Sequence, residues 1–193
     1  MVQEWQQIGE DAVLQEKYGK RFVQRRLVNP RTEKEDDFYL YGRRNGAIVF
    51  PVTEDGKVIV VKQFRQGIMG ITFELPAGIA RTGEDMVLAV RRELLEETGY
   101  EPGELFQTRN GVCLDATSSW TKDQTFLAFG CRRVGEAADN PRESIELVLM
   151  SFEEWMAHVF VGGEPMDSGS VAATLYAIPF LLRRGLITSN TLQ

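Results

Sequence analysis

The feature that most constrains this chain is an acidic, amphipathic segment around residues 84–98, which predicts a single helix. Thr82 and Asp85 have the spacing of a capping box, and Gly99 suits the left-handed residue that often ends a helix. Glu84 and Asp85 are then expected in the first turn, where the helix dipole favours negative charge. The helix is therefore well defined at both ends.

The side chains of this helix divide into an acidic face and an apolar stripe. At about 100° per residue, Glu93, Glu96 and Glu97 stand on one face. The apolar stripe lies to another side: Val87, Leu88, Val90, Leu94 and Leu95. Like charges at these spacings repel by roughly a few tenths of a kcal/mol per exposed pair. A solvated acidic face is one interpretation, and a hard divalent cation such as Mg²⁺, which takes oxygen ligands, is the other.

The charge balance of the whole chain centres on the same segment. The chain has 193 residues, with 28 acidic and 22 basic side chains and a formal net charge of −6. Residues 74–101 contain seven of the acids and only three of the bases, so most of the surplus lies around the helix. A protein that coats nucleic acid would carry the opposite balance, so no nucleic-acid partner is expected.

Histidine and cysteine are too scarce for most other site chemistries. His158 is the single histidine, and Cys113 and Cys131 are the two cysteines. A histidine pair and a four-cysteine zinc site are therefore excluded, so carboxylates must carry most of any metal or acid–base chemistry. We expect His158 to be structural or solvated on a surface helix, and both cysteines to be reduced.

The sequence contains no signal for secretion or membrane insertion. Residues 1–21 lack a basic segment followed by an apolar one. The longest apolar candidate, residues 171–182, is shorter than the roughly 18 residues that a membrane helix needs. We therefore expect a cytoplasmic protein with no membrane partner.

The pattern of residues divides the chain into two parts, of which residues 1–44 are the first. Two strand-like stretches, 21–28 and 36–41, are separated by a turn at 29–31. They predict a small antiparallel sheet, which is too thin to be stable alone. Such a sheet must pack on the main domain or on a second copy of the chain.

Residues 45–193 show a mixed α/β pattern. Asp55 and Gly56 form a hairpin signal between the first two of four expected strands. The expected strands are 47–52, 58–61, 125–129 and 145–150. The last of three expected helices is capped by Asp167 or Ser168. The expected helices are 84–98, 152–159 and the stretch from that cap to about residue 184.

The acidic helix and the residues before it resemble the Nudix box, written G-x5-E-x7-R-E-U-x-E-E-x-G-U with U aliphatic. Eight positions match in register: Gly78, Glu84, Arg92, Glu93, Leu94, Glu96, Glu97 and Gly99. Only the last position departs, because Tyr100 is aromatic. This many positions at set spacing form a far more specific signal than a lone glycine motif.

The resemblance implies a Nudix hydrolase, with an α/β/α sandwich around a mixed sheet. Such enzymes cleave a nucleoside diphosphate linked to another group, with Mg²⁺ or possible Mn²⁺ as cofactor. By motif position, Glu93 and Glu97 are metal ligands, and Glu96 lies beside the metal as a ligand or proton acceptor. Glu84 and Arg92 pair to orient the loop and the helix. The physical logic agrees, because metals neutralise pyrophosphate oxygens and activate a water.

Two segments before the box resemble the branch that hydrolyses ADP-ribose and other nucleoside diphosphate sugars. They are Val61-Lys62-Gln63-Phe64-Arg65 and Glu74-Leu75-Pro76-Ala77-Gly78. In that branch the Ala77 position provides a backbone carbonyl to a metal. The Arg65 position contacts substrate phosphates or the strands near them, and Arg44 matches another substrate arginine. A surface ion pair is the alternative for each arginine, and Arg43 could take the role of Arg44.

The same branch implies a role for the N-terminal sheet. There the sheet typically exchanges between two subunits and helps to form the base-binding site, so we expect a homodimer through residues 1–44. Aromatic residues of this region could stack on a base, or could be core or interface residues instead. They include Trp5, Phe38, Tyr39 and Tyr41.

Residues 114–120 depart from the branch. ADP-ribose hydrolases often carry an S-P-G motif after the box, and this stretch contains no proline. The departure weakens a strict assignment to ADP-ribose. It also leaves Trp120 as a residue that could shape the pocket for another substrate.

The late loop departs from the branch as well. Glu143 aligns with a further metal-contacting acid, whereas Pro141 replaces the acid that is the base in some relatives. Glu143 or Glu96 would then be the catalytic base, with Glu146 as the fallback, because a base must reach the attacking water. A solvated loop acid is the alternative for Glu143.

The leading hypothesis is a Mg²⁺-dependent pyrophosphatase for ADP-ribose and related nucleoside diphosphate sugars. It would release a nucleoside monophosphate and a sugar phosphate. One alternative is a GDP-mannose-selective hydrolase. Another acts on dinucleoside polyphosphates or capped RNA, which the acidic balance disfavours. A non-catalytic nucleotide-sugar sensor is the alternative from a different class, although it would be expected to lose box carboxylates.

Overall fold

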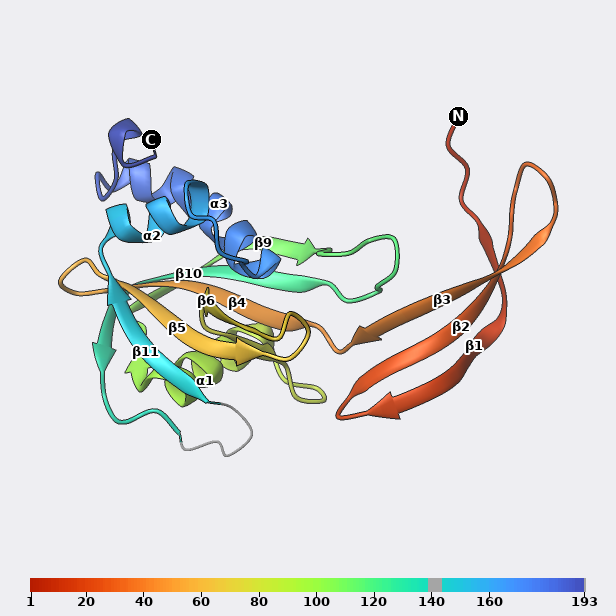
Figure 1. Ribbon diagram of the computed structural model, residues 1–193, viewed down its shortest axis with the longest axis horizontal. Helices are drawn as coiled ribbons and strands as arrows, with labels where there is room; N and C mark the ends of the chain where they lie inside the picture. The colour runs from red at the N-terminus through yellow and green to blue at the C-terminus, as the bar shows by residue number, and fades with distance from the viewer. Residues whose placement is uncertain (139–143, 193) are drawn as a thin grey trace. The chain divides into compact units, whose positions relative to one another are not determined.

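In the computed structural model, the chain divides into two units (Figure 1). The structure describes residues 1–138 and 144–192. Unit 1 contains residues 1–45 and 113–122, and unit 2 contains the other described residues. The roles in dimerisation and base binding that the sequence suggests for residues 1–44 stay predictions.

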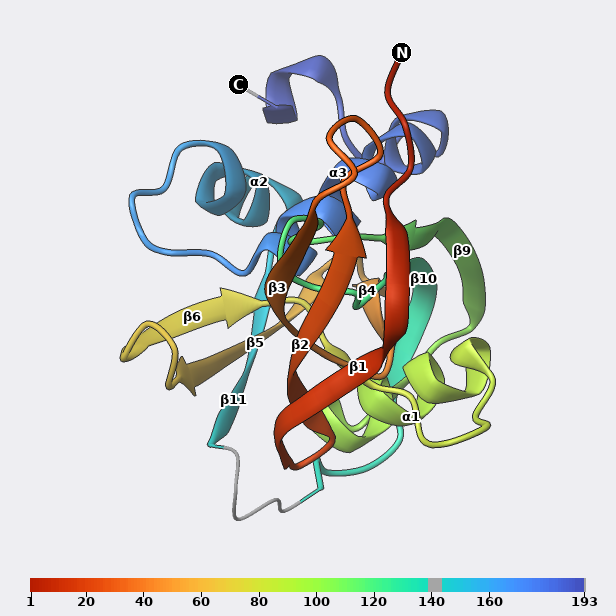
Figure 2. The ribbon, with the colours of Figure 1, turned by 90° about the vertical axis from the view of Figure 1, so that its right-hand side faces the viewer.

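Unit 1 is built on a three-stranded antiparallel sheet with the order β1-β2-β3 (Figure 2). Its strands are β1 (Gln6–Lys17), β2 (Lys20–Val28) and β3 (Glu35–Arg43). The two strands predicted at 21–28 and 36–41 are confirmed as β2 and β3. The sequence does not predict β1 because its alternation is irregular: Gly9 has a φ of +65° and the register against β2 shifts twice.

Residues 113–122 are held against β3 inside unit 1. The amide of Tyr41 donates a hydrogen bond to the carbonyl of Ser118 at 2.9 Å. The indole of Trp120 lies against Gly42, where a Cβ would overlap the ring. Glycine at this position therefore allows the close packing that joins this distant loop to the N-terminal sheet.

Unit 2 is built around a mixed sheet with the main order β11-β5-β4-β10-β8. β6 pairs with β5, β7 with β4 and β9 with β10, and the pairing of β4 with β10 is parallel whereas the others are antiparallel. The strands are β4 (Gly46–Thr53), β5 (Val58–Arg65), β6 (Gly70–Glu74), β7 (Ala77–Ile79), β8 (Tyr100–Glu101), β9 (Glu104–Val112), β10 (Asp123–Arg133) and β11 (Ile145–Met150).

Helices cover both faces of this sheet. The helices are α1 (Met86–Thr98), α2 (Phe152–Phe160) and α3 (Ser168–Arg183), followed by a 3₁₀ turn, Ser189–Leu192. Along β4, Val49 packs in one core cluster with Val90 of α1, whereas Phe50 packs in another with Trp155 of α2 and Ala177 of α3. Figure 1 shows α1 on one side of the sheet and α2 and α3 on the other. The predicted α/β/α sandwich is confirmed.

The four predicted strands of unit 2 are present as β4, β5, β10 and β11, and the three predicted helices are present as α1, α2 and α3. Asp167 is the N-cap of α3, as one of the two predicted alternatives. β6 and β7 are too short for a clear pattern, and Pro76 lies between them. β9 is mostly exposed and contains Gly111 with a φ of +74°, so it has no apolar run to reveal it.

The start of α1 corrects the sequence prediction. The N-cap is Asp85 and not Thr82, because its carboxylate accepts hydrogen bonds from the amides of Val87 at 2.8 Å and Leu88 at 3.3 Å. The helix begins at residue 86, so the two acids expected in its first turn precede it. Gly99 ends the helix as predicted, with a φ of +75°.

The buried face of α1 also differs from the predicted stripe. The buried residues are Ala89, Val90, Leu94 and Thr98. Val87 and Leu88 are exposed, whereas Met86, the first residue of the helix, packs against the core. The core face therefore follows Met86, Val90 and Leu94 and is rotated from the predicted stripe.

His158 and the cysteines have structural surroundings. The imidazole of His158 packs edge-on against Phe73, with ring centroids 5.1 Å apart, and its Nε2 is buried without a hydrogen-bond partner among the described residues. Cys131 is buried, which raises the pKa of its thiol to about 12. Cys113 is exposed and both thiols are free. Within the described ranges, no helix is long and apolar enough to cross a membrane.

The corrected face of α1 predicts unequal effects of two leucine substitutions. Leu94 is 1% exposed, so Leu94→Ala should lower the free energy of unfolding by about 2–5 kcal/mol. Leu88 is 61% exposed, so Leu88→Ala should change it by less than about 0.5 kcal/mol. Urea unfolding followed by circular dichroism measures both. Equal losses for the two variants would contradict this assignment of the core face.

Candidate active site

The acidic face of α1 lies against the backbone of β7. The carboxylate of Glu93 contacts Gly78 so closely that a Cβ there would overlap it. The amide of Ala77 donates a hydrogen bond to Oε2 of Glu97 at 3.1 Å. The packing of α1 on the sheet therefore brings two of the predicted metal ligands to the strand that carries the third, the carbonyl of Ala77.

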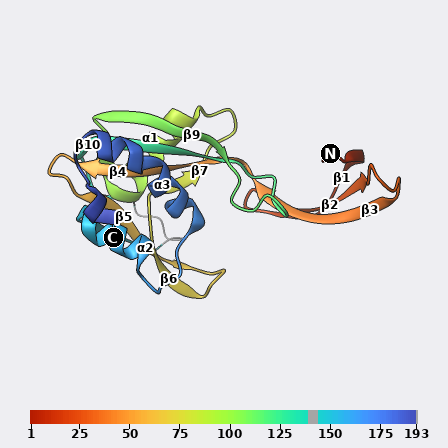
Figure 3. The same ribbon diagram turned by 90° about the horizontal axis from the view of Figure 1, so that it is seen from above.

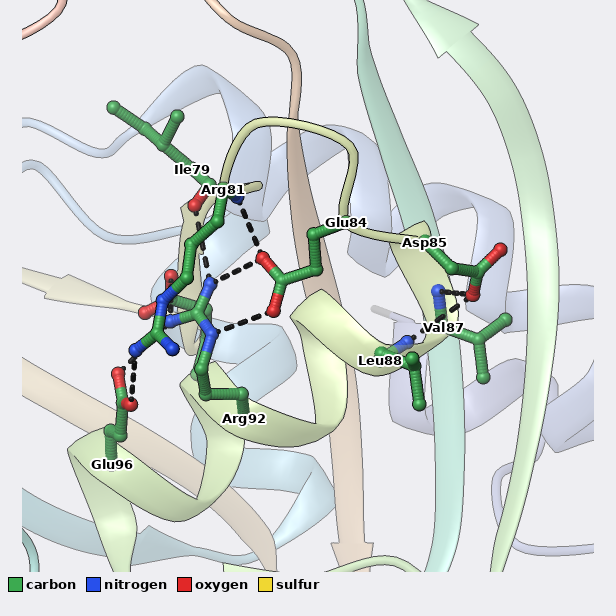
Figure 4. Close-up of polar contacts among 9 residues, drawn as sticks. Ile79, Arg81, Glu84, Asp85, Val87, Leu88, Arg92 and Glu96 are labelled. Atoms are coloured by element: carbon green, nitrogen blue, oxygen red, sulfur yellow. Dashed lines mark hydrogen bonds and ion pairs between the residues drawn. The ribbon is translucent and has the colours of Figure 1, made fainter.

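Arg92 is the centre of the polar contacts on this face (Figure 4). Its Nε and Nη2 each donate to the carboxylate of Glu84 at 2.9 Å, in a bidentate pair. Its Nη1 donates to Glu93 at 2.7 Å and to Glu96 at 3.0 Å. Nη2 also reaches the carbonyl of Ile79 at 3.3 Å. One guanidinium thus joins three carboxylates and the backbone of β7.

Glu84 orients the loop before α1 through the same pair. Its carboxylate also accepts a hydrogen bond from the amide of Arg81 at 2.7 Å. The hydrogen bonds from Arg92 and from this amide lower the pKa of Glu84 to about 2. In turn, the carboxylate of Glu84 raises the pKa of Arg92 above its ordinary value. The arginine therefore stays charged, and the loop stays attached to the helix.

Arg81 is a basic residue that the sequence motif does not single out. Its Nη2 donates to Glu96 at 3.2 Å (Figure 4). Together with Arg92 it places positive charge beside Glu96, so part of the like-charge repulsion on this face is relieved by the protein itself. No spacing rule reveals Arg81, because its contact depends on the folded path of the loop.

The donor set on this face fits a hard divalent cation. Carboxylate oxygens of Glu93 and Glu97 and the carbonyl of Ala77 are the oxygen ligands that Mg²⁺ and Mn²⁺ take. Over residues 1–138 and 144–192, no three acidic, histidine or cysteine side chains form a ready-made metal cage. Glu93 and Glu96 instead direct an oxygen to Arg92. Metal binding would accordingly require these carboxylates to reorient.

Arg65 has a buried partner. It forms a bidentate ion pair with Glu74, which is 2% exposed, and Glu74 also accepts hydrogen bonds from Thr72 at 2.5 Å and from Gln63 at 3.2 Å. The hydrogen bonds with Glu74 raise the pKa of Arg65. The structure therefore places Arg65 at the end of β5, bound to β6, and its contact with substrate phosphates stays a prediction.

Three further predicted residues are not among the contacts of this cluster that the structure describes. Arg44 belongs to unit 1, where its carbonyl accepts a hydrogen bond from Nη1 of Arg43 at 2.9 Å. Glu146 lies on β11 and pairs with Lys62 at 2.9 Å. Glu143 lies outside the described residues, so its predicted roles as metal ligand and base stay predictions.

Comparison with known structures agrees with the architecture described above. A solved structure entitled "Crystal structure of ADP compounds hydrolase" matches with a TM-score of 0.79 over 97% of this chain and 99% of that chain, at 15% sequence identity. This likeness shows the fold alone. Fold and acidic helix together define an α/β protein whose mixed sheet carries a carboxylate-rich helix.

Residues 42–165 match the family model of the NUDIX domain, and the chain belongs to this family. It is 46% identical over 142 residues to the ADP-ribose pyrophosphatase of Bacillus subtilis (strain 168), covering 70% of this chain and 71% of the relative. It is 30% identical over 138 residues to the methanol dehydrogenase activator of Bacillus methanolicus, covering 69% and 70%. The family and the enzyme class predicted from the sequence, a Nudix pyrophosphatase, are confirmed.

The lowered pKa of Glu84 predicts an acid-dependent loss of stability. A carboxyl group whose pKa falls from 4.5 to about 2 on folding stabilises the folded state above pH 4.5, and this contribution disappears as the pH falls toward 2. The unfolding free energies of the wild type and Glu84→Gln should therefore differ above pH 4.5 and converge below it. Urea unfolding at a series of pH values in metal-free buffer measures this. A difference that does not change with pH would contradict it.

Proposed function

We propose that the protein is a Mg²⁺-dependent pyrophosphatase that hydrolyses ADP-ribose and related nucleoside diphosphate sugars. The products would be a nucleoside monophosphate and a sugar phosphate. The observation that carries the proposal is the contact of Glu93 and Glu97 with the backbone at Ala77 and Gly78. Mn²⁺ is the alternative metal, and the cytoplasmic location stays a prediction.

Glu93, Glu97 and the carbonyl of Ala77 would hold the metal. When bound, the cation would supply charge neutralisation at the pyrophosphate and lower the pKa of a coordinated water. Arg92 and Glu84 fix the backbone of the helix against the loop, so the carboxylates need only side-chain rotation beside β7 to meet a metal. Rigid placement matters because small displacements of reacting groups reduce rates strongly.

Glu96 is the residue that we assign to proton transfer among the described acids. Its side chain is 41% exposed, whereas that of Glu93 is 14% exposed, so water reaches Glu96 more readily. In the step, the water oxygen bonds to a phosphorus of the diphosphate, and the bridging P–O bond breaks. The proton of the water passes to Oε1 or Oε2 of Glu96, and the phosphate of one product leaves with the bridging oxygen.

The N-terminal sheet is proposed to join two copies of the chain and to contribute to base binding. Several of its large apolar side chains are exposed, and two of them, Phe22 and Tyr39, stack with ring centroids 6.2 Å apart. Contiguous exposed apolar side chains often mark an interface. A second copy is the occupant that the resemblance to the ADP-ribose branch favours.

A substrate panel with one charge-removing variant tests the activity. The wild type with Mg²⁺ should release a nucleoside monophosphate from ADP-ribose, ADP-glucose, UDP-glucose or GDP-mannose, and the ranking by kcat/KM identifies the preferred sugar. Glu97→Gln should lower kcat by about 100-fold, since it removes a ligand charge. Glu101→Gln, an exposed acid just beyond the helix, is the matched control and should retain wild-type rates.

Three outcomes of the panel are decisive. If no sugar nucleotide is cleaved by the wild type, the proposed activity is wrong. Tight binding of ADP-ribose without cleavage would favour the sensor. Turnover by Glu97→Gln at the wild-type rate would remove this residue from the metal site.

The proposed dimer predicts a change in mass for one surface variant. The wild type should sediment as two chains, and the double variant Phe22→Asp with Tyr39→Asp should sediment as one, because burying carboxylates in an apolar interface is unfavourable. Leu88→Asp, on the exposed start of α1, is the control and should leave the mass unchanged. Analytical ultracentrifugation over a concentration series measures all three. A monomeric wild type would contradict the proposal.

A further inference from the structure

The chain changes its hydrogen-bonded neighbour just before the proposed carbonyl ligand. Glu74 ends β6 opposite Val61 of β5, whereas Ala77 begins β7 opposite Ile48 of β4. The two residues between them, Leu75 and Pro76, form an elbow that connects the two pairings. Figure 3 labels the two strands, β6 and β7, that the elbow joins. We call Leu75–Pro76 the strand-switch elbow. Its conformation sets the direction in which β7 starts.

The elbow lies outside regular strand pairing, so other groups must satisfy its polar atoms. The carbonyl of Pro76 accepts a hydrogen bond from the amide of Val49 at 3.0 Å. The amide of Leu75 donates to Oγ of Ser170 at 2.9 Å. Leu75 is 1% exposed and Ser170 is fully buried. A side chain from α3, distant in the sequence, thus supplies the acceptor that the buried amide requires.

The hydroxyl of Ser170 is oriented for this task by Asp167. Oγ of Ser170 lies 3.1 Å from Oδ2 of Asp167 and donates to it, and the amide of Ser170 donates to the same oxygen at 2.8 Å. Because a hydroxyl has one proton and two lone pairs, directing the proton to the carboxylate leaves a lone pair for the amide of Leu75. The N-cap of α3 therefore sets the rotation of the hydroxyl that holds the elbow.

A second set of buried hydrogen bonds joins α3 to α2 one turn further along the helix. Thr174 donates from Oγ1 to the carbonyl of Ser170 at 2.8 Å, and Trp155 of α2 donates from Nε1 to Thr174 at 3.0 Å. Thr174 and Trp155 are both buried. These bonds stabilise α3 but involve no atom of the elbow. Removing them should therefore lower the stability of the helix without changing the position of the elbow.

We propose that Ser170, oriented by Asp167, is a positioning residue for the metal site through the strand-switch elbow and the carbonyl of Ala77. The inference rests on the proposed function, which makes that carbonyl a metal ligand. A backbone carbonyl has no rotamers, so its position depends on the bonds that hold the chain on either side of it. Before this carbonyl, Ser170 holds the amide of Leu75 and Glu97 holds the amide of Ala77, and after it β7 pairs with β4. Groups that orient ligands in this way typically affect metal affinity.

Two substitutions on α3 separate positioning from stability. Ser170→Ala removes the acceptor of the Leu75 amide, and the Kd for Mn²⁺, measured by electron paramagnetic resonance without substrate, should rise about tenfold. In the hydrolysis assay its kcat should fall by a similar factor with KM changed less than about twofold. Thr174→Val, the matched control, removes buried hydrogen bonds from the same helix. It should lower the Tm but leave the Kd for Mn²⁺ at the wild-type value.

The results distinguish this inference from the proposed function. If Ser170→Ala binds Mn²⁺ like the wild type, or if Thr174→Val weakens binding equally, the positioning role is overturned. If Ser170→Ala does not fold, Ser170→Cys replaces it, because a thiol is a weaker acceptor of similar shape. Its Kd should lie above that of the wild type, and an unchanged Kd would overturn the role. A wild type that binds Mn²⁺ but cleaves no sugar nucleotide contradicts the proposed function alone.

Discussion

The site depends on the hydrogen bonds and ion pairs that the guanidinium of Arg92 forms. It joins Glu84 of the loop to Glu93 and Glu96 of α1, and it also reaches the carbonyl of Ile79 on β7. Without it, three carboxylates in the same part of the molecule would repel one another and the loop would lose its attachment to the helix. The contact explains how a protein can keep a concentrated acidic face folded while leaving the carboxylates close to a strand backbone.

Next to Arg92, backbone atoms of β7 are also part of the proposed site. β7 is three residues long and follows directly on the strand-switch elbow, so its place depends on contacts from several elements. Gly78 allows Glu93 to approach, Glu97 accepts from the amide of Ala77, and β4 pairs along the strand. The buried ion pair of Arg65 with Glu74 anchors the preceding strand. The site is therefore a property of the packed sheet and helix and not of the helix alone.

The sequence predicted the elements with strong local signals and missed those without them. The acidic helix, its Gly99 terminus and the capped helix at Asp167 have patterns that act over a few residues. Thr82 illustrates the limit, because a capping spacing can be met by a residue that does not cap. β6 and β7 have no comparable pattern, since their stability comes from neighbours distant in the chain.

The sequence by itself determined the family through the fixed spacing of the box residues, and the resemblance to that family implied the fold class and the pairing of Glu84 with Arg92. Only the tertiary structure decided that Arg65 pairs with the buried Glu74. It alone brought Ser170 to the amide of Leu75. These contacts join segments whose separation in the sequence carries no periodic signal, and they form because each buried polar group must find a partner.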